Sequence, residues 1–231
     1  MPDDESLDRP WLQLWLSKVD DRTRASELQV RDSFSPIECD RLERIGSSKR
    51  AREFLLSRAL MRHALCQQFG GSAADWAVDA SEGPPTPRAN LPDGIHLSLS
   101  HSGGFICFAI ANGRVGVDIE RSDRRRRFDE TAAQFMNPDE QQQFADAQAH
   151  RVDYFFRCWC AKEAAYKQLG QSDQNGVSLK SIDYHELLAG SGRRQLLEAE
   201  GNGLVMAVVT EVEPQRIDVR DYLVTVPLNL R

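Results

Sequence analysis

The spacing of apolar residues along the chain predicts two long helices. The first is expected over residues 50–69, where apolar positions recur near the 3.6-residue period of a helix, and Gly70-Gly71 would end it. The second is expected over residues 152–169, where aromatic residues serve as apolar anchors. Shorter helices are expected at residues 129–135 and 138–147.

Strands are predicted where apolar and polar residues alternate, or where short apolar runs lie between turn residues. They are expected at residues 11–16, 95–100, 105–110, 115–119, 181–184, 196–199, 204–209 and 222–226. The dipeptide Asn112-Gly113 is typical of a hairpin turn, so the strand that follows it is expected to pair with the strand before it. The Pro- and Gly-rich residues 81–94 are expected to form a loop.

The order of a helix followed by several strands occurs twice. We therefore expect an α+β fold built as a pseudo-twofold pair of similar α+β halves. Residues 1–112 would form the N-terminal half and residues 113–231 the C-terminal half, which carries the acidic motifs described below. This is a repeat of element order and not of sequence.

Composition narrows the class of protein. The chain has 231 residues, 41% of them hydrophobic, and a formal net charge of −6, so bulk charge favours no nucleic-acid partner. No apolar run approaches the roughly 20 residues of a membrane helix, and the acidic N-terminus does not resemble a signal peptide. The five cysteines are odd in number and lack zinc-site spacing. We expect a cytoplasmic protein with reduced thiols and no membrane partner.

Two acids lie at the end of an apolar run in the segment GVDIE, residues 116–120. Asp118 and Glu120 are two residues apart on a strand, so both point to one face, about 6–7 Å apart. Mg²⁺ is commonly held by one or two carboxylates together with substrate phosphates. The alternative is a pair of solvated acids at a strand end.

A carboxylate and an ammonium lie one helical turn apart in the segment WCAKEAAYK, residues 159–167. Glu163 and Lys167 have the i, i+4 spacing that also forms ordinary surface ion pairs. Taken with Asp118 and Glu120, they supply three acids and a lysine, which could hold a divalent cation and a polyphosphate.

The segment Ser100-His101-Ser102 follows a predicted strand. It lacks the Gly-x-Ser-x-Gly elbow of a serine hydrolase, so a catalytic triad is not indicated. Its imidazole could donate to a phosphate, or it could be an exposed turn histidine.

Basic residues gather at the start of the first long helix, where the helix dipole disfavours cations. They are Lys49, Arg50 and Arg52, with Arg58 and Arg62 further along on what could be the same side. This cluster indicates an anionic partner, and a solvated basic face is the alternative.

Three segments in this order and spacing resemble the 4′-phosphopantetheinyl transferase superfamily, of the larger surfactin-synthetase-activating (Sfp) type. They are GVDIE at 116–120, WCAKEAAYK at 159–167 and LSLSHS at 97–102, the last similar to the family's Asn-Ile-Ser-His-Ser. The resemblance runs from about residue 40 to residue 170.

The resemblance implies a holo-[acyl-carrier-protein] synthase activity. Such enzymes move 4′-phosphopantetheine from coenzyme A to a serine of an acyl, polyketide or peptidyl carrier protein, releasing 3′,5′-ADP. It implies Mg²⁺, with Mn²⁺ also suitable, held by Asp118, Glu120 and Glu163. Glu163 would help to deprotonate the carrier serine, and Lys167 would neutralise the leaving phosphate. A monomer is expected, with coenzyme A between the two halves.

The resemblance also implies contacts to the coenzyme. Ser100 and His101 would contact its nucleotide, and Lys49 or Arg52 its 3′-phosphate. The chain departs from the family at residues 83–85, where Gly-Pro-Pro replaces Gly-Lys-Pro and a phosphate-contacting lysine is missing. Arg88 is a candidate replacement.

A run of arginines directly follows the two strand acids, which is notable in an acidic protein. We expect this positive patch, beside the apolar Phe135 and Met136, to dock the acidic helix of a carrier protein. The residues expected to dock it are Arg124, Arg125, Arg126, Arg127 and Phe128. A solvated basic loop is the alternative.

Two other functions use the same residues. One is a non-catalytic carrier- or nucleotide-binding protein of the same fold. The other is a Mg²⁺-dependent hydrolase of the coenzyme A pyrophosphate, which would need an ordered water in place of a protein serine.

Overall fold

The computed structural model of the chain describes residues 9–79, 86–87, 91–122, 128–170, 172–190 and 194–230. Its helices are α1 (Arg24–Gln29), α2 (Pro36–Glu43), α3 (Ser48–Phe69), α4 (Phe128–Phe135), α5 (Pro138–Asp146), α6 (Arg151–Gln168) and α7 (Tyr184–Leu188). Short 3₁₀ helices lie at Val30–Ser33, Gln148–His150 and Leu179–Ser181. Its strands are β1 (Trp11–Lys18), β2 (Val78–Asp79), β3 (Thr86–Pro87), β4 (His96–Ser102), β5 (Phe105–Ala111), β6 (Val115–Arg121), β7 (Gln195–Gly201), β8 (Leu204–Thr210), β9 (Arg216–Asp221) and β10 (Asn229–Leu230).

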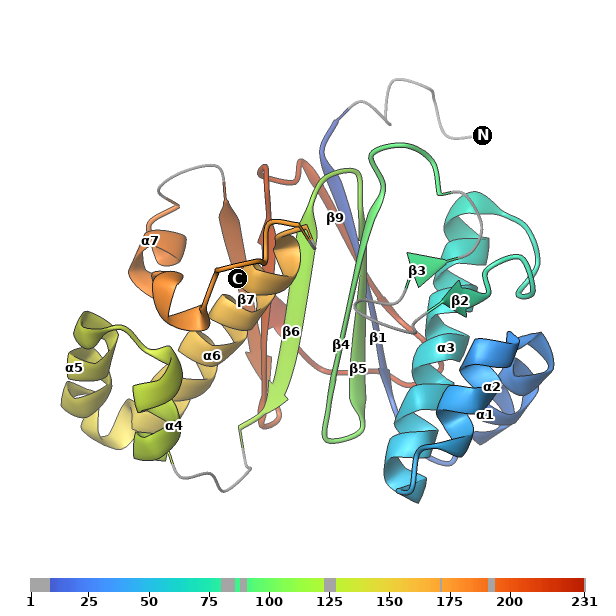
Figure 1. The fold of residues 1–231 in the computed structure, drawn as a ribbon, viewed down its shortest axis with the longest axis horizontal. Helices are drawn as coiled ribbons and strands as arrows, with labels where there is room; N and C mark the ends of the chain where they lie inside the picture. The colour runs from blue at the N-terminus through green and yellow to red at the C-terminus, as the bar shows by residue number, and fades with distance from the viewer. Residues whose placement is uncertain are drawn as a thin grey trace.

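Two four-stranded sheets lie between two long helices, so each half has a helix packed on a sheet (Figure 1). The first sheet has the strand order β4-β5-β1-β9, and α3 lies against it. The second has the order β10-β7-β8-β6, and α6 lies against it. The expected α+β fold with two similar halves is confirmed.

The layers are held by apolar clusters on both faces of each sheet. Along β1, Leu12, Leu14 and Leu16 face the second sheet, whereas Trp11 and Trp15 face α3. This is the two-residue alternation of a strand, but here both faces meet apolar neighbours. Removing this area from water stabilises the fold by about 25 cal/mol per Å² of apolar surface.

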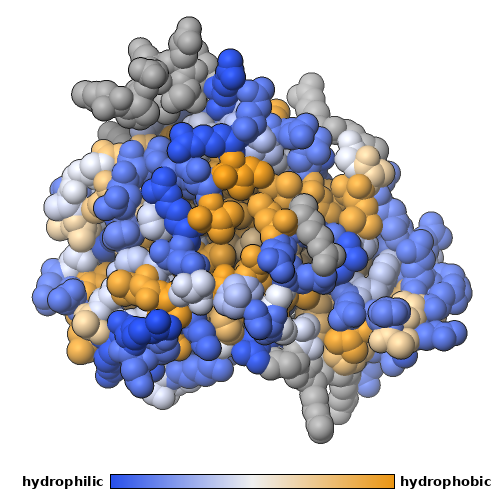
Figure 2. Space-filling model, turned by 180° about the vertical axis from the view of Figure 1, so that it is seen from behind, coloured by the Kyte–Doolittle hydropathy of each residue, from blue (hydrophilic) through white to orange (hydrophobic). Residues whose placement is uncertain are grey.

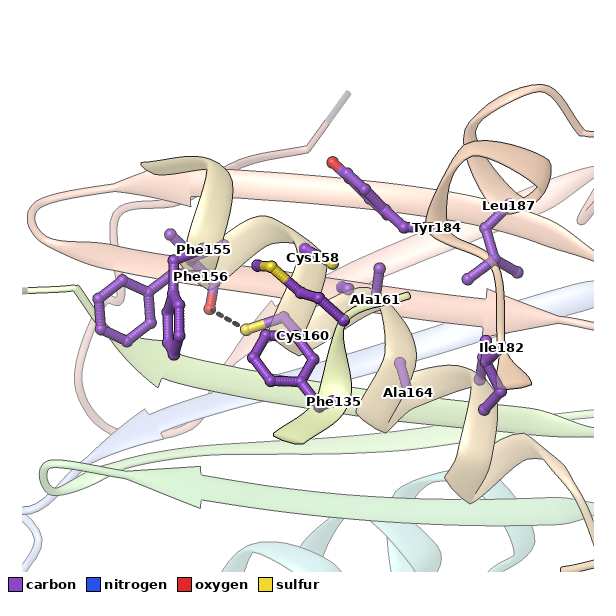
Figure 3. Packing of buried hydrophobic residues seen from close by; sticks show 14 of the residues in the cluster. Phe135, Phe155, Phe156, Cys158, Cys160, Ala161, Ala164, Ile182, Tyr184 and Leu187 are labelled. Atoms are coloured by element: carbon purple, nitrogen blue, oxygen red, sulfur yellow. Dashed lines mark hydrogen bonds between the residues drawn. The ribbon is translucent and has the colours of Figure 1, made fainter. Parts of the chain in front are cut away.

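The second half has its own aromatic core between α6 and its sheet (Figure 3). Phe135 of α4 and Phe155 of α6 make an edge-to-face pair with ring centroids 5.4 Å apart. The thiol of the buried Cys160 donates to the Val205 carbonyl of β8 at 3.5 Å, which ties α6 to the sheet. All five cysteines are free thiols, as expected.

Both long helices end and begin close to where the sequence places them. Gly70 follows the last residue of α3 with a positive φ of 79°, which a glycine adopts at no steric cost. At α5, Asn137 and Glu140 form a capping box, and Pro138 is the first helical residue. The helices expected at 129–135 and 138–147 are likewise present as α4 and α5.

The strand after Asn112-Gly113 is present as β6, but its predicted pairing with the preceding strand is wrong. β6 pairs antiparallel with β8 in the second sheet. The side chain of Asn112 accepts from the N–H of Trp11 at 2.7 Å and donates to the carbonyl of Arg9 at 2.8 Å. It thus holds the start of β1, and the chain passes from one sheet to the other instead of forming a hairpin.

The strand predicted at 181–184 is also wrong. Asp183 accepts hydrogen bonds from the N–H groups of His185 and Glu186, at 2.8 and 3.1 Å, and so begins helix α7. Aspartate at this position favours a helix start, and that local preference outweighs the apolar alternation.

The strand predicted at 222–226 lies earlier, as β9. The following segment is not extended because Leu223 adopts a left-handed φ of 65°. Val224 and Val226 are nevertheless buried, which explains why this segment resembles a strand in sequence.

Helix α2 was not predicted, although its start carries a recognisable signal. Ser35 accepts from the N–H of Glu38, whose carboxylate accepts in turn from the N–H of Ser35, and Pro36 follows the cap. The pattern Ser-Pro-x-Glu is a capping-box signature and could have revealed the helix.

Strand β9 comes late in the chain but lies in the first sheet. It runs parallel to β1, with Trp11 opposite Arg216 and Leu16 opposite Asp221. β10 then pairs with β7 in the second sheet. The division into residues 1–112 and 113–231 stays a prediction. It would place β9 in the C-terminal half, although β9 lies in the first sheet.

The surface opposite the view of Figure 1 carries a central gathering of hydrophobic residues bordered by hydrophilic ones (Figure 2). Large apolar side chains that are about half exposed include Val219 (50%) and Leu223 (53%). Among the described residues, no helix combines the length and the hydropathy needed to cross a bilayer.

Candidate functional site

A cleft of about 630 Å³ opens between α3 of the first half and α6 of the second. Strand β4 forms its floor, and the end of α2 contributes to its rim. The lining residues are Arg41, Ile45, Arg50, Phe54, Ser57, Arg58, Leu97, Ser98, Leu99, His101, Glu163, Tyr166, Lys167 and Gln174. These residues come from both sides of residue 112, and the coenzyme site expected between the two halves stays a prediction.

The wall of this cleft that α2 and α3 provide is cationic. Arg41, Arg50 and Arg58 lie on it, whereas Glu163 is the acid that lines the cleft from α6. Arg58 is only 3% exposed, and burial lowers its pKa to about 10, which leaves it charged at neutral pH. An anion in the cleft would meet several fixed positive charges.

Arg58 shares its acidic partner with a second arginine. Glu38 accepts two hydrogen bonds from Arg62, at 3.0 and 2.7 Å, and lies 3.4 Å from the Nε of Arg58. That Nε is buried and makes no hydrogen bond in the described structure. One carboxylate thus faces two buried guanidinium groups, so this end of the cleft carries excess positive charge.

A glycine allows α6 to approach β6. A Cβ atom on Gly116 would lie 1.9 Å from the carbonyl oxygen of Ala164 and 2.5 Å from the backbone nitrogen of Gln168. No side chain fits there, so the first residue of the GVDIE segment has a packing role. The close approach brings the acids of β6 next to α6.

Asp118 and Lys167 meet where these two elements touch. Lys167 Nζ lies 2.7 Å from Asp118 Oδ1 and 3.4 Å from Ser100 Oγ, and it also donates to the Val117 carbonyl at 3.3 Å. Burial alone would lower the pKa of Lys167, but the charges of Asp118 and Glu163 raise it above its usual value. The ammonium is therefore fixed in its charged form at the edge of the cleft.

The carboxyl groups of this site repel one another and are partly removed from water. Burial raises the pKa of Asp118, opposed by Lys167 and Ser100, while Glu120 raises it further. Burial likewise raises the pKa of Glu163, opposed by Lys167 and reinforced by Asp118 and Glu120. The pKa of Glu163 thus responds to both strand acids and that of Asp118 responds to Glu120, which places the three carboxyl groups in one electrostatic cluster.

The suitability of this cluster for a divalent cation can be judged from its oxygen atoms. Within the described part of the chain, no three His, Cys, Asp or Glu side chains form a ready metal-binding group. Asp118 Oδ2, however, is buried and accepts no hydrogen bond from any described residue. An unused buried carboxylate oxygen beside two further acids suits Mg²⁺ or Mn²⁺, which take carboxylates together with substrate phosphate.

His101 lines the cleft from β4, with its side chain about half exposed at 53%. Its Nδ1 lies 3.7 Å from the carboxylate of Glu53 on α3. Partial burial lowers its pKa, Glu53 opposes this, and Lys167, Arg58 and Arg50 lower it further. The cations gathered around the imidazole show again that this region would accept an anion.

The basic residues expected on α3 separate into two groups. Arg50 and Arg58 line the cleft. Arg52 instead pairs with the buried Glu27 at 2.8 Å and donates to the Asp20 carbonyl, and Lys49 is exposed at the helix start and does not line the cleft. Sequence reasoning also missed Arg41, which lies on the helix that was not predicted.

Ser100 does not line the cleft, unlike its neighbour His101. Its hydroxyl points to β6, where it donates to Asp118 Oδ1 at 2.8 Å. Residues 83–85, Arg88 and residues 124–127 lie outside the described residues.

The apolar part of the expected carrier-docking patch is mostly buried. Phe135 and Met136 belong to the core of the second half, at 2% and 0% exposure, so they cannot contact a partner. Phe128 is partly buried against Phe155 and borders a hollow of about 420 Å³ beside α5 and α6. Within that patch it is the apolar residue that remains accessible in the described structure.

The fold and the cleft thus define a protein of two α+β halves that is suited to hold a phosphorylated ligand beside clustered acids. Comparison with known proteins identifies the family. The sequence pattern of the 4′-phosphopantetheinyl transferase superfamily matches residues 114–226. The chain is 30% identical to the 4′-phosphopantetheinyl transferase AcpT of Escherichia coli (strain K12) over 159 residues, 68% of this chain and 77% of that protein.

Two Bacillus proteins are similar as well. The 4′-phosphopantetheinyl transferase psf-1 of Bacillus pumilus is 29% identical over 166 residues, 71% of this chain and 70% of that protein. The 4′-phosphopantetheinyl transferase Sfp of Bacillus subtilis (strain 168) is 26% identical over 154 residues, 66% of this chain and 67% of that protein. The chain belongs to the 4′-phosphopantetheinyl transferase superfamily, and the resemblance inferred from its motifs is confirmed.

Proposed function

We propose that this protein transfers the 4′-phosphopantetheine group of coenzyme A to a serine hydroxyl of an acyl or peptidyl carrier protein. In this reaction the serine oxygen forms a bond to the β-phosphorus of the coenzyme. The bridging bond of the pyrophosphate breaks, and 3′,5′-ADP leaves. The observation that best supports the proposal is the cleft, in which an arginine-lined wall faces the cluster of Asp118, Glu163 and Lys167.

The cationic wall would bind the phosphates of the coenzyme. Arg41 lines it from α2, Arg50 and Arg58 line it from α3, and His101 lines the cleft from β4. The guanidinium groups of arginine match phosphate oxygens in a bidentate geometry. We therefore assign the 3′-phosphate to this arginine group and not to Lys49 or Arg52.

Glu163 would accept the proton of the carrier serine, directly or through a water. Its raised pKa makes it a stronger base than an ordinary glutamate, and it lies on the cleft where the serine must enter. Lys167, held charged beside Asp118, would neutralise charge on the departing phosphate.

Asp118, Glu120 and Glu163 would hold the divalent cation, Mg²⁺ or Mn²⁺. When bound, such an ion supplies positive charge to the pyrophosphate oxygens. Asp118 Oδ2 is the atom of this site best prepared for it, because it is buried and accepts no hydrogen bond from the residues that the structure describes.

The carrier would dock on Arg124, Arg125, Arg126, Arg127 and Phe128. Support for this comes from the concentration of positive charge in an acidic protein and from the accessible edge of Phe128. We further propose that the protein acts as a cytoplasmic monomer, since both walls of its cleft come from one chain.

The test is intact-mass spectrometry of an apo carrier protein incubated with this protein, coenzyme A and Mg²⁺. We expect the carrier to gain the mass of one phosphopantetheine group, and the gain to disappear with a chelator or with Glu163→Ala. Activity retained by Glu163→Ala would keep the function but remove the assigned role of that residue. Lys49→Ala, an exposed change outside the cleft, is the matched control and should retain the gain.

Two other outcomes would replace the proposal. Formation of 3′,5′-ADP with free phosphopantetheine and an unmodified carrier would indicate a coenzyme A pyrophosphate hydrolase. Coenzyme binding with no product across several carrier types would indicate a non-catalytic binding protein.

A further inference from the structure

We propose that two serines of β4 are positioning residues for the acids of β6. Ser100 would orient Asp118 and Ser102 would orient Glu120, so that both carboxylates are ready for a divalent cation. This inference rests on the proposed function, because it takes these acids as cation ligands.

The serines bridge the edges of two different sheets. β4 ends the first sheet and β6 ends the second, and the two strands run side by side in Figure 1. The hydroxyl oxygens of β4 accept hydrogen bonds from backbone N–H groups of β6. The pairs are Ser98 with Val117 at 3.0 Å, Ser100 with Ile119 at 3.2 Å and Ser102 with Arg121 at 3.4 Å.

These contacts repeat because of strand geometry. Alternate residues of a strand point to the same face, so three serines at two-residue spacing reach the N–H groups of every second residue of β6. All three are buried, with exposures of 6%, 6% and 4%. Their hydroxyl oxygens thus accept the hydrogen bonds that the backbone carbonyls of a neighbouring strand would accept in a continuous sheet.

Two of the three hydroxyls also hold an acid. The Ser100 hydroxyl donates to Asp118 Oδ1 at 2.8 Å, and the Ser102 hydroxyl donates to Glu120 Oε2 at 2.5 Å. A hydroxyl has a single proton, so each serine that accepts from the backbone and donates to a carboxylate is fixed in its rotation. The backbone of β6 therefore sets the direction in which each serine hydroxyl donates its hydrogen bond to the carboxylate.

The consequence is clearest at Asp118. Its Oδ1 receives both Ser100 and Lys167, whereas its Oδ2 is buried and accepts no hydrogen bond in the described structure. The hydrogen bond from Ser100 thus helps to fix the orientation of the carboxylate, with Oδ1 bonded to protein groups and Oδ2 available to a cation. Groups that orient metal ligands typically contribute about 10–100-fold to metal affinity.

The same strand also faces the coenzyme. His101 lies between the two serines and points to the opposite face, into the cleft. One strand would then fix the acids on one side and contact a phosphate on the other. A shift of β4 at the coenzyme would be transmitted to both acids.

The test measures Mn²⁺ binding directly, by the electron paramagnetic resonance signal of free Mn²⁺ in the presence of protein and coenzyme A. We expect Ser100→Ala to weaken Mn²⁺ binding about 10–100-fold, with Ser100→Thr, which keeps the hydroxyl, closer to wild type. The Mg²⁺ concentration for half-maximal carrier modification should rise in the same order.

Ser98→Ala is the matched control. It removes the same kind of bond to β6, so it should lower the stability to urea to a similar degree as Ser100→Ala. Ser98 also lines the cleft, so the comparison is made both without coenzyme A and at saturating coenzyme A. Because the hydroxyl of Ser98 is directed to the Val117 N–H and not to Asp118 or Glu120, Mn²⁺ affinity under both conditions should stay within about twofold of wild type.

Equal weakening of Mn²⁺ binding by Ser98→Ala and Ser100→Ala, or no weakening by either, would overturn the inference. If Ser100→Ala does not fold, Ser102→Ala tests the same claim through Glu120. If the wild type modifies carriers and the double variant Ser100→Ala, Ser102→Ala still binds Mn²⁺ as tightly as the wild type, only this inference is refuted. If the wild type neither modifies carriers nor binds Mn²⁺, the proposed function and the inference are refuted together.

Discussion

At the scale of single residues, neighbouring arginines of α3 have different roles because they contact different groups. Arg52 donates two hydrogen bonds to the fully buried Glu27, which also lies 3.4 Å from Arg24, and it does not line the cleft. Arg58 lines the cleft, and its Nε lies 3.4 Å from Glu38 without a hydrogen bond in the described structure, because Arg62 takes the hydrogen bonds of that carboxylate. Arg52 is therefore a structural ion pair, whereas Arg58 can also meet a ligand.

We therefore expect Arg58→Ala to raise KM for coenzyme A about tenfold with a smaller change in kcat, because it removes a charged contact worth about 1.5–3 kcal/mol. Glu38 keeps Arg62 as its partner, so the fold should survive. Steady-state kinetics with varied coenzyme A would show the effect, and an unchanged KM would remove Arg58 from the binding site.

Arg52→Ala is the contrasting variant. It should leave KM unchanged but lower the free energy of unfolding by about 2 kcal/mol, less than for a fully buried pair because the Arg52 side chain is 28% exposed. Burial opposes the shift, but hydrogen bonds from Arg52 and Thr23 hold the pKa of Glu27 below its usual value of 4.5. The stability difference from wild type should therefore be full above pH 4.5 and shrink as pH falls further.

The sequence could predict some of these residues but not their partners. Strand and helix periods are sufficient to place Asp118 with Glu120 and Glu163 with Lys167. The roles of the arginines are harder to predict, because α3 is buried on nearly all sides from Glu53 to Arg62. Its helical period therefore does not indicate a single exposed face. The direction of Ser100 is likewise decided by β6, which comes from the other sheet.

At the scale of elements, the site depends on how closely α6 lies on β6. Gly116 permits this approach, and it sits two residues before Asp118 in the same strand. The sequence predicts both elements because each has a clear period. It does not predict their neighbours, since strand pairing is set by contacts between distant residues.

Gly116→Ala should therefore separate the two elements. Its Cβ would overlap the Ala164 carbonyl, so we expect a loss of about 3 kcal/mol in the free energy of unfolding. Displacement of Lys167 from Asp118 by about 1 Å should reduce kcat about 100-fold. Urea unfolding and carrier-modification kinetics would measure the two effects.

Gly113→Ala is the matched change for this prediction. A Cβ there meets only the Val212 side chain, at 4.0 Å, and the residue lies in the turn that precedes β6. Its stability and activity should resemble wild type. Comparable losses in both variants would mean that the close approach at Gly116 is not what limits the site.

At the scale of the whole molecule, charge is distributed unevenly. The chain carries a formal net charge of −6, yet its cleft wall is rich in arginine and its longest arginine run follows β6. An acidic carrier would be repelled by the molecule as a whole and attracted to this region. Such local complementarity mainly sets the rate and orientation of association.

Replacing Arg124, Arg125 and Arg126 by Ala should raise KM for the carrier severalfold and weaken its dependence on salt. In the wild type, KM should rise with salt as charges more than about 8–10 Å apart become screened. Replacing three exposed arginines elsewhere, Arg22, Arg44 and Arg216, gives the same change in net charge as a control. Equal effects of the two triple variants would assign the salt dependence to total charge.

The pairing of β9 with β1 also affects how the protein folds during its synthesis. β1 leaves the ribosome long before β9, its parallel neighbour, because most of the described elements lie between them in the chain. The first sheet thus cannot close until β9 has emerged, and one edge of β1 stays open until then. Long-range parallel pairing is slow to form, and an open edge can pair with another chain. Newly made protein should accordingly be most prone to aggregate in the interval between the release of β1 and the release of β9.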